Sequence, residues 1–199
     1  NAAIPKEYKG SAIVIGNFDG LHQGHQKVFR EAKKIARKNK IKFGVLTFTP
    51  LPVMFFNKKI NNYKLVSENQ KSKLFKKEGV DFVMNIKFNK FFSKISAEKF
   101  IKNIIYKKIN PKSLFVSNNF KFGNKRKGDV NLLKKFSKKC DYRLQKISPI
   151  RYQRKVISST RIRNCLQKGQ LDLANKLLSR TWFIEGPVTI GKKLGRKLG

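Results

Sequence analysis

Two histidines three residues apart are the side chains of this chain best placed for chemistry. They fall in the stretch Gly16-Asn17-Phe18-Asp19-Gly20-Leu21-His22-Gln23-Gly24-His25, after an apolar run that ends at Ile15. A buried strand, a glycine-rich turn and a helix start, in that order, direct free backbone N–H groups and the positive end of a helix dipole at a ligand, which favours phosphate. We predict that His22 and His25, the only histidines present, donate hydrogen bonds to a polyphosphate, while Gly24 lets the backbone approach it.

The same stretch argues against several familiar sites. Histidines at this spacing could bind zinc, but no third Cys, His, Asp or Glu ligand lies nearby in an ordered pattern. The loop is not a Walker-type P-loop, because no Gly-Lys-Ser/Thr follows the strand, and it is not the GxGxxG loop of dinucleotide enzymes. Asp19 is its only acid, and no side chain is placed as an obvious nucleophile beside a base. The pattern indicates positioning and charge stabilisation, the strategy of phosphoryl and nucleotidyl transfer.

A second candidate anion site follows late in the chain, in the run Ile157-Ser158-Ser159-Thr160-Arg161-Ile162-Arg163. The hydroxyls of Ser158, Ser159 and Thr160, the N–H groups of a helix start and the Arg163 guanidinium together suit the charge on a transferring phosphate. The simpler interpretation is a helix cap followed by two surface arginines. Because the histidine motif already indicates an anion, we favour the functional interpretation.

Strands and helices must alternate to position these loops. Strands are expected at 11–15, 41–48, 80–86, 113–116 and 142–147, and helices at 23–38, 67–78, 96–110, from 129, from 158 and at 172–178. This alternation predicts an α/β fold, a Rossmann-like, doubly wound parallel sheet with helices on both faces. Ligands bind such sheets beyond the carboxyl ends of the strands. The glycine-punctuated loops 16–20 and 117–128 both lie there, so we expect them to converge on one crevice.

Three more local patterns make predictions. The prolines of Thr49-Pro50-Leu51-Pro52 argue against a helix and predict a rigid loop. Phe88, Phe91 and Phe92 are expected to form an aromatic core cluster. From Trp182 to Gly191 the residues alternate as in a strand. We therefore expect one domain over residues 1–181 and, over 182–199, a linker and the first strand of a second domain.

Charge and composition bound the class of protein. The chain has 47 Lys and Arg against 11 Asp and Glu, a net charge of +36. These cations are spread out, beside frequent Asn, Ile and Phe, so we favour a solvated surface that steers anions over a nucleic-acid patch. No apolar run approaches the ~18 residues of a membrane span, and no signal-peptide pattern begins the chain. Two cysteines without a CxxC spacing suit a reducing cytoplasm; the oligomeric state stays open.

These segments, taken in order, carry a family resemblance. Residues 16–25 resemble the HxGH motif of the nucleotidylyltransferase superfamily. More narrowly, the chain resembles the adenylyltransferase module of the bacterial bifunctional riboflavin kinase/FMN adenylyltransferases, or FAD synthetases. The further segments that carry this resemblance are 47–52, 79–81, 119–123 with Gly128, 157–163, 177–180, 186–188 and 191–199.

The resemblance implies a reaction and a set of site residues. AMP would pass from ATP, with its Mg²⁺, to FMN, giving FAD and pyrophosphate; the metal ligands stay open. His22, His25 and Arg163 would be catalytic. ATP and its phosphates would be bound by Gly16, Asn17, Phe18, Asp19, Gly20, Gly24, Ser158, Ser159 and Thr160. The flavin and nucleotide side would be lined by Thr47, Pro50, Asn119, Phe120, Phe122 and Gly123.

The resemblance also has departures and alternatives. Ser117 and Lys121 stand where the family usually has glycine and arginine, and lysine lacks the two-pronged contact of arginine. The segment 182–199 resembles the start of a β-barrel riboflavin kinase domain, truncated at Gly199, so kinase activity is expected only of a full-length protein. The alternatives are an HxGH enzyme that adenylylates pantetheine phosphate or nicotinamide mononucleotide, and a basic nucleic-acid-binding module.

Overall fold

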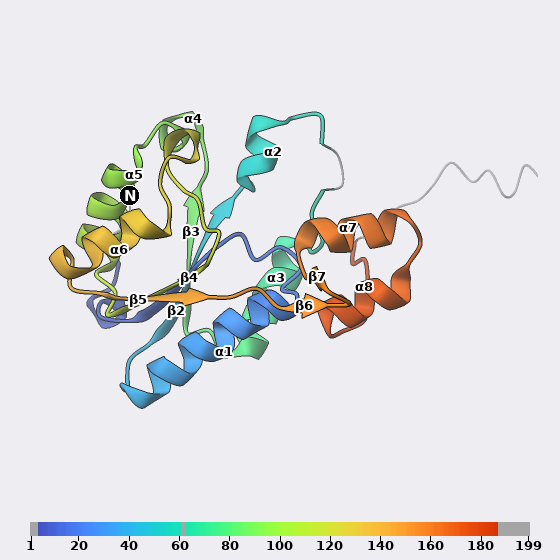
Figure 1. Cartoon of the computed structure of the whole chain (residues 1–199), viewed down its shortest axis with the longest axis horizontal. Helices are drawn as coiled ribbons and strands as arrows, with labels where there is room; N and C mark the ends of the chain where they lie inside the picture. Colours follow the sequence, from blue (N-terminus) through green and yellow to red (C-terminus); the bar gives the residue numbers. More distant parts are fainter. Residues whose placement is uncertain (1–3, 61–62, 187–199) are drawn as a thin grey trace, which may run out of the picture.

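The central element is a sheet of five parallel strands. A computed structural model describes residues 4–60 and 63–186. The strands are β1 (Ala12–Ile15), β2 (Phe43–Thr49), β3 (Phe82–Lys87), β4 (Ser113–Ser117) and β5 (Arg143–Ile147). They lie in the order β3-β2-β1-β4-β5 (Figure 1). The predicted Rossmann-like, doubly wound sheet is confirmed, and the direction of winding switches between the neighbours β1 and β4.

Helices cover both faces of the sheet, as expected. The helices that connect the strands are α1 (Gln23–Lys38), α3 (Glu68–Glu78), α5 (Ala97–Lys99) continued by the π-helix η2 (Phe100–Ile109), and α6 (Val130–Lys139). Ala12 and Val14 share a core cluster with residues of α1 and α3, whereas Ile13 and Ile15 share one with residues of η2 and α6. This alternation along β1 follows from the two-residue period of a strand.

The predicted helix ends rest on local capping chemistry. Ser67, Ser96 and Asp129 each accept a hydrogen bond from the backbone N–H three residues later. Ser67 and Gln70 complete a capping box, and α3 ends at Gly79 with φ of +81°. A glycine adopts this left-handed conformation without a Cβ penalty, which explains why the helix stops there.

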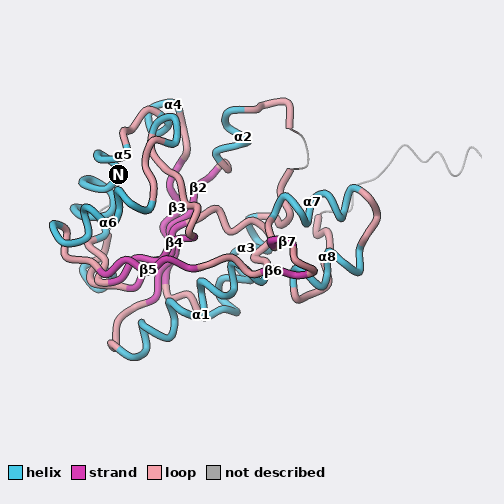
Figure 2. The backbone as a smooth tube through the Cα atoms, in the orientation of Figure 1, coloured by secondary structure: helices cyan, strands magenta, loops and turns pink. Residues whose placement is uncertain are grey.

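A smaller group of elements follows the sheet. It consists of β6 (Arg151–Tyr152), β7 (Lys155–Val156), α7 (Ser159–Gln167) and α8 (Leu171–Leu178), and Figure 2 shows it to one side of the sheet. Ile162, Leu177 and Leu178 are fully buried in its core together with Leu65. Leu65 precedes α3, so this group is anchored to the sheet domain through the start of α3.

The remaining short elements correct two predictions. They are η1 (Lys6–Tyr8), α2 (Pro52–Phe56), α4 (Lys90–Ser93) and η3 (Asn124–Arg126). The expectation that the prolines exclude a helix is wrong, because Pro52 opens α2 at a position where its missing N–H costs nothing. Phe88 and Phe92 join the aromatic cluster, but Phe91 is 86% exposed, since the single turn of α4 presents only one side to it.

The segment after α8 also differs from expectation. Residues 182–186 form no strand. The Trp182 indole N–H instead donates to the Leu65 carbonyl at 2.9 Å, and its backbone N–H donates to the Asn175 side chain at 2.7 Å. These bonds hold Trp182 against the preceding domain. The rest of the predicted strand, and the glycines of the tail, lie outside the described residues.

Two expectations drawn from composition concern membrane spans and cysteines. In the described ranges, no helix combines the length and the apolar character needed to cross a membrane. Cys140 and Cys165 are both buried and free, as expected for structural thiols.

Candidate active site

The loop between β1 and α1 is folded tightly at the carboxyl end of the sheet. Phe18, Gly20 and Leu21 have positive φ angles of 50°, 80° and 39°. The Phe18 ring is buried and lies over Gly16, where an added Cβ would come within 2.9 Å of it. The Gly16 N–H donates to the Leu46 carbonyl of β2 at 3.1 Å. The loop therefore has a defined shape before any ligand binds.

His22 and His25 stack on each other at the start of α1. Their ring centroids are 3.7 Å apart with an angle of 19° between the planes. His22 is the N-cap of α1, and its Nδ1 accepts a hydrogen bond from the His25 backbone N–H at 3.4 Å. With Nδ1 as acceptor, the proton of a neutral ring is assigned to Nε2, which leaves an N–H donor for a ligand.

Burial keeps both imidazoles neutral. It lowers the pKa of His22 to about 4, although its own backbone partly opposes the shift. Burial, assisted by His22 and Lys71, lowers the pKa of His25 well below 6.5. The Nδ1 of His25 is buried and has no hydrogen-bond partner among the described residues. A buried nitrogen without a partner is costly, so this atom is a candidate for contact with a ligand.

Gly24 lies against the His22 ring. An added Cβ would lie 3.1 Å from Cε1 and Nδ1 of His22 and 3.6 Å from the Ile157 carbonyl oxygen. The His22 ring thus fills the space that a side chain at this position would need, and contact of the Gly24 backbone with a phosphate stays a prediction. Glycine at this position allows the stacked histidine pair to form.

Asp19 and Arg163 form an ion pair between the two predicted anion sites. The Asp19 carboxylate accepts from Arg163 Nη2 and, at 3.0 Å, from the Leu65 backbone N–H. The Nε of Arg163 donates to the Tyr63 carbonyl at 2.7 Å, and its guanidinium lies 3.6 Å from the centre of the Tyr63 ring. Burial raises the pKa of Asp19, while Arg163 and the Leu65 amide lower it. Arg163 is therefore already positioned by protein groups.

The hydroxyls of the second anion site are placed as follows. Ser159 Oγ donates to the Asp19 carbonyl at 2.9 Å, which joins α7 to the first loop. Ser158 Oγ caps α7 by accepting from the Arg161 N–H at 3.2 Å. Thr160 is exposed. The structure thus brings the two predicted anion sites together, and Ser158 and Ser159 also have structural bonds there.

Thr47 and Lys71 lie beneath the β1–α1 loop. Thr47 is buried, and its Oγ1 donates to the Asn17 carbonyl at 3.3 Å and accepts from Lys71 Nζ at 3.0 Å. Pro50 follows a cis peptide bond after Thr49. Lys71 was missed because nothing in its spacing separates it from the many other lysines. Arg180 was also given no role, yet its Nη2 donates to the Gly20 carbonyl at 2.9 Å.

The predicted flavin loop packs against α5. Phe120 and Phe122 stack with centroids 5.4 Å apart, and Phe122 forms a bridge with Gly128. An added Cβ on Gly123 would come within 2.6 Å of the Ala97 backbone nitrogen, so the loop lies against α5. Asn119 is exposed. Within residues 4–60 and 63–186, no hydrogen bond joins residues 119–123 to residues 16–25. Their convergence on one crevice stays a prediction.

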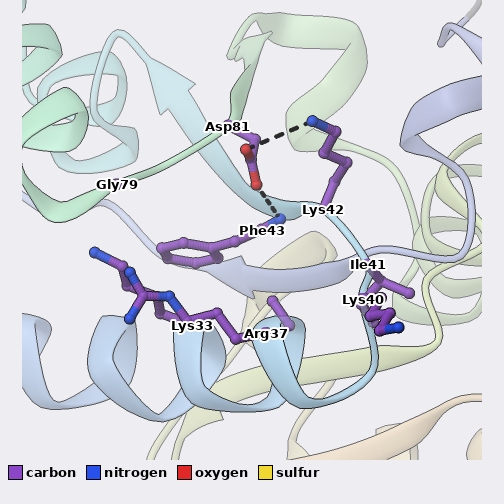
Figure 3. Close-up of a pocket in the computed structure, with 9 residues that line it drawn as sticks. Lys33, Arg37, Lys40, Ile41, Lys42, Phe43, Gly79 and Asp81 are labelled. Atoms are coloured by element: carbon purple, nitrogen blue, oxygen red, sulfur yellow. Dashed lines mark hydrogen bonds and ion pairs between the residues drawn. The ribbon is translucent and has the colours of Figure 1, made fainter.

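A basic hollow of about 450 Å³ lies at the opposite edge of the sheet, at the amino ends of β2 and β3. It is lined by Lys33, Arg37, Lys40 and Lys42. The Asp81 carboxylate, which also lines it, accepts a hydrogen bond from the Phe43 N–H and forms an ion pair with Lys42 (Figure 3). Its cations are exposed or half-buried. None of the predicted site residues lines it.

Comparison with known proteins identifies similar sequences over nearly the whole chain. The profile of a family described as FAD synthetase matches residues 4–161. Proteins named bifunctional riboflavin kinase/FMN adenylyltransferase are similar: one from Buchnera aphidicola of Schizaphis graminum is 43% identical over 98% of this chain and 63% of its own length. Those of Haemophilus influenzae and Escherichia coli K12 are 35% and 31% identical, each over 96% of this chain and 62% and 61% of their own lengths.

A solved structure shares the fold. It is described as "Crystal Structure of Macrolide-efflux Protein from Streptococcus pneumoniae", with a TM-score of 0.83 and 28% identity over 98% of this chain and 63% of that chain. The chain spans about three fifths of the length of the curated relatives that it matches.

Proposed function

Since this chain belongs to the FAD synthetase family, we propose that it transfers AMP from ATP to FMN. An oxygen of the FMN phosphate attacks the α-phosphorus of ATP. The bond from that phosphorus to the bridging oxygen of the β-phosphate breaks, and pyrophosphate leaves with the electron pair. The products are FAD and pyrophosphate, and no protein nucleophile is needed.

The observation that carries the proposal is the stacked, neutral histidine pair at the N-terminus of α1. The reaction moves negative charge from the attacked phosphate onto the leaving pyrophosphate. Preorganised donors stabilise such charge without reorganising at the moment of reaction. The Nε2–H of His22, the ring of His25 and the N-terminus of α1 are donors of this kind.

The other site residues follow from their positions. Arg163, held by Asp19, would supply positive charge near His22. The ATP phosphates would be enclosed by Gly16, Asn17, Phe18, Gly20, Ser158, Ser159 and Thr160. Thr47 and Pro50 would border the acceptor side. Aromatic rings gather at the carboxyl ends of β2 and β3, where Phe55 and Phe88 pack edge to face with centroids 5.3 Å apart, and would offer an apolar surface to the flavin. Phe120 and Phe122 would extend this flavin side.

The residues present do not form a cage for Mg²⁺. In the described ranges, no group of three or more His, Cys, Asp and Glu side chains could hold a metal ion. The Asp19 carboxylate is already bound by Arg163 and the Leu65 N–H. Mg²⁺ commonly enters such sites on nucleotide phosphates and keeps several waters. We propose that it comes with ATP, and we assign it no protein ligand.

The deciding experiment is an assay of the purified protein with ATP, Mg²⁺ and FMN. FAD should form in step with pyrophosphate. Pantetheine phosphate and nicotinamide mononucleotide, added as competing acceptors, should give no adenylylated product. Failure of a folded protein to make FAD would refute the proposal, and preference for another acceptor would change the substrate.

For the whole protein we also propose riboflavin kinase activity. The support is the name of the relatives, which are longer than the matched region. A protein that also carries the region of the relatives beyond the match should convert riboflavin and ATP to FMN, while residues 1–199 alone should not. Kinase activity of residues 1–199 would contradict this assignment.

A further inference from the structure

Lys71 is the most deeply buried lysine or arginine in the part of the chain that the structure describes, with 5% of its surface exposed. It lies on α3, one turn after the Ser67 cap. The helix holds its side chain beneath the β1–α1 loop, where Nζ donates to Thr47 Oγ1. A lysine is rarely buried without a partner, so this position needs an explanation.

Protein groups account for only part of the bonding capacity of Lys71. An ammonium has three N–H donors, and the described residues accept from one of them, through Thr47 Oγ1 at 3.0 Å. No carboxylate of residues 4–60 or 63–186 lies within 4.0 Å of Nζ, because Asp19, the acid of the adjoining loop, is paired with Arg163. The buried site therefore carries more positive than negative charge.

The charge of Lys71 lies close to the histidine pair. Lys71 is near enough to His25 to lower its pKa, and the unpartnered Nδ1 of His25 is buried there. The chain of bonds from Lys71 through Thr47 to the Asn17 carbonyl links α3, the end of β2 and the β1–α1 loop. Asn17 is exposed, so the upper side of this group adjoins solvent.

Charge completes the argument. Burial lowers the pKa of Lys71, while Glu68 and Asp19 partly oppose that shift. A phosphate placed against Nζ would supply the missing negative charge and accept its free N–H groups. Resting on the proposed function, we infer that Lys71 binds a substrate phosphate, that of FMN or one of those of ATP, and is a substrate-binding residue of this site.

The test compares Lys71→Met with Thr47→Val. The first removes the charge and the hydrogen bond, and the second removes the bond to Lys71 but keeps the charge. Lys71→Met should lower kcat/KM for FAD formation by about 100-fold, whereas Thr47→Val should lower it by less than about 10-fold. Lys76→Met, on the exposed side of the same helix, is the control and should stay within about 2-fold.

Thermal unfolding separates ligand binding from support of the fold. Removing an uncompensated buried charge leaves stability equal or higher, so the melting temperature of Lys71→Met should not fall. If Lys71→Met and Thr47→Val lose activity equally and both melt earlier, Lys71 is a structural link and the inference is wrong. Should Lys71→Met not fold, Lys71→Gln repeats the measurement with a neutral polar side chain.

Equilibrium binding identifies the phosphate and separates this inference from the proposed reaction. Loss of a charge-assisted contact should weaken one phosphorylated ligand about 10- to 100-fold. If the partner is the FMN phosphate, the preference of the protein for FMN over riboflavin disappears in Lys71→Met; if it is ATP, the preference for ATP over adenosine disappears. Unchanged preferences in both arms overturn the inference. A wild-type protein that binds these ligands but makes no FAD overturns the proposed function alone.

Discussion

Two basic regions of this protein lie at opposite edges of one sheet and differ in burial. At the amino ends, the hollow beside α1 is lined by Arg37, Lys40 and Lys42, which are exposed to solvent. At the carboxyl ends, Asp19, His22, Thr47 and Lys71 are all buried. An exposed cation is solvated at little cost, whereas a buried one needs a partner. Net charge alone therefore does not distinguish the two regions of this lysine-rich chain, whereas burial of charge favours the carboxyl ends as the candidate site.

The largest difference between the two regions should appear in catalysis. His25→Ala removes a preorganised donor from the loop, and we expect the rate of FAD formation to fall by about 100-fold or more. Arg37→Ala, in the hollow, should leave the rate within about 2-fold. Steady-state kinetics at saturating ATP and FMN measures both. An undiminished rate in His25→Ala would remove this histidine from the mechanism.

Stability should separate the regions next. Asp19→Asn leaves the Arg163 guanidinium without its charge partner in a mostly buried pair, and we expect the free energy of unfolding to fall by about 3 kcal/mol. Asp81→Asn weakens a bond to the Phe43 N–H and an ion pair at 3.8 Å whose side chains are 53% and 39% exposed. Its loss should be about 1 kcal/mol. Urea unfolding at pH 8 tests the order, and equal losses would contradict it.

Acid should act on the buried site through His22. Its pKa is about 4 in the folded protein against an ordinary 6.5. The contribution of His22 to the free energy of unfolding is therefore fully present above pH 6.5. It is lost as the pH falls towards 4, because the unfolded chain takes up the proton first. At pH 5 the loss should be about 2 kcal/mol.

His22→Asn isolates this contribution. Asparagine caps helices well and does not titrate. The pKa of Asp19 is raised in the folded protein, so protonation of Asp19 in acid favours the folded state. Because Asp19 is present in both proteins, its effect cancels in the comparison. The free energy of unfolding should fall between pH 7 and pH 5 by about 2 kcal/mol less in the variant than in the wild-type protein. Identical differences would show that His22 is not held neutral.

The parts of the fold that were predictable depend on local signals. Ser67, Asp129 and Gly79 act within a few residues of themselves, and the apolar spacing of α1 and the strands reports which side is buried. The histidine motif was equally local, since the strand, turn and helix start follow one another. The prediction for Pro52 failed because proline breaks a helix interior but suits its first position.

The parts that were not predictable depend on contacts between distant residues. Arg163 and Asp19 are separated by 144 positions, and nothing near either one specifies that they pair. Lys71 resembles its exposed neighbours in sequence until α3 is placed beneath the loop. Trp182 alternates with its neighbours as in a strand, yet its bonds to Leu65 and Asn175 hold it in another conformation. Tertiary packing decides each of these cases.

The smallest effect is expected in the hollow itself. The triple variant Arg37→Gln, Lys40→Gln, Lys42→Gln removes three cations that line it. We expect kcat to be unchanged, kcat/KM to change by less than about 2-fold through weaker steering of the substrates, and this change to vanish at high salt. A salt-independent loss of activity would mean that the hollow takes part in the reaction.

The reaction is tested most directly by following each phosphate of ATP. With ATP labelled at the α-phosphate, the label should appear in FAD; with ATP labelled at the γ-phosphate, it should appear only in pyrophosphate. His25→Ala should slow both transfers by the same factor. Label from the γ-phosphate in a flavin product, or no α-label in FAD with folded protein, would contradict adenylyl transfer at the β1–α1 loop.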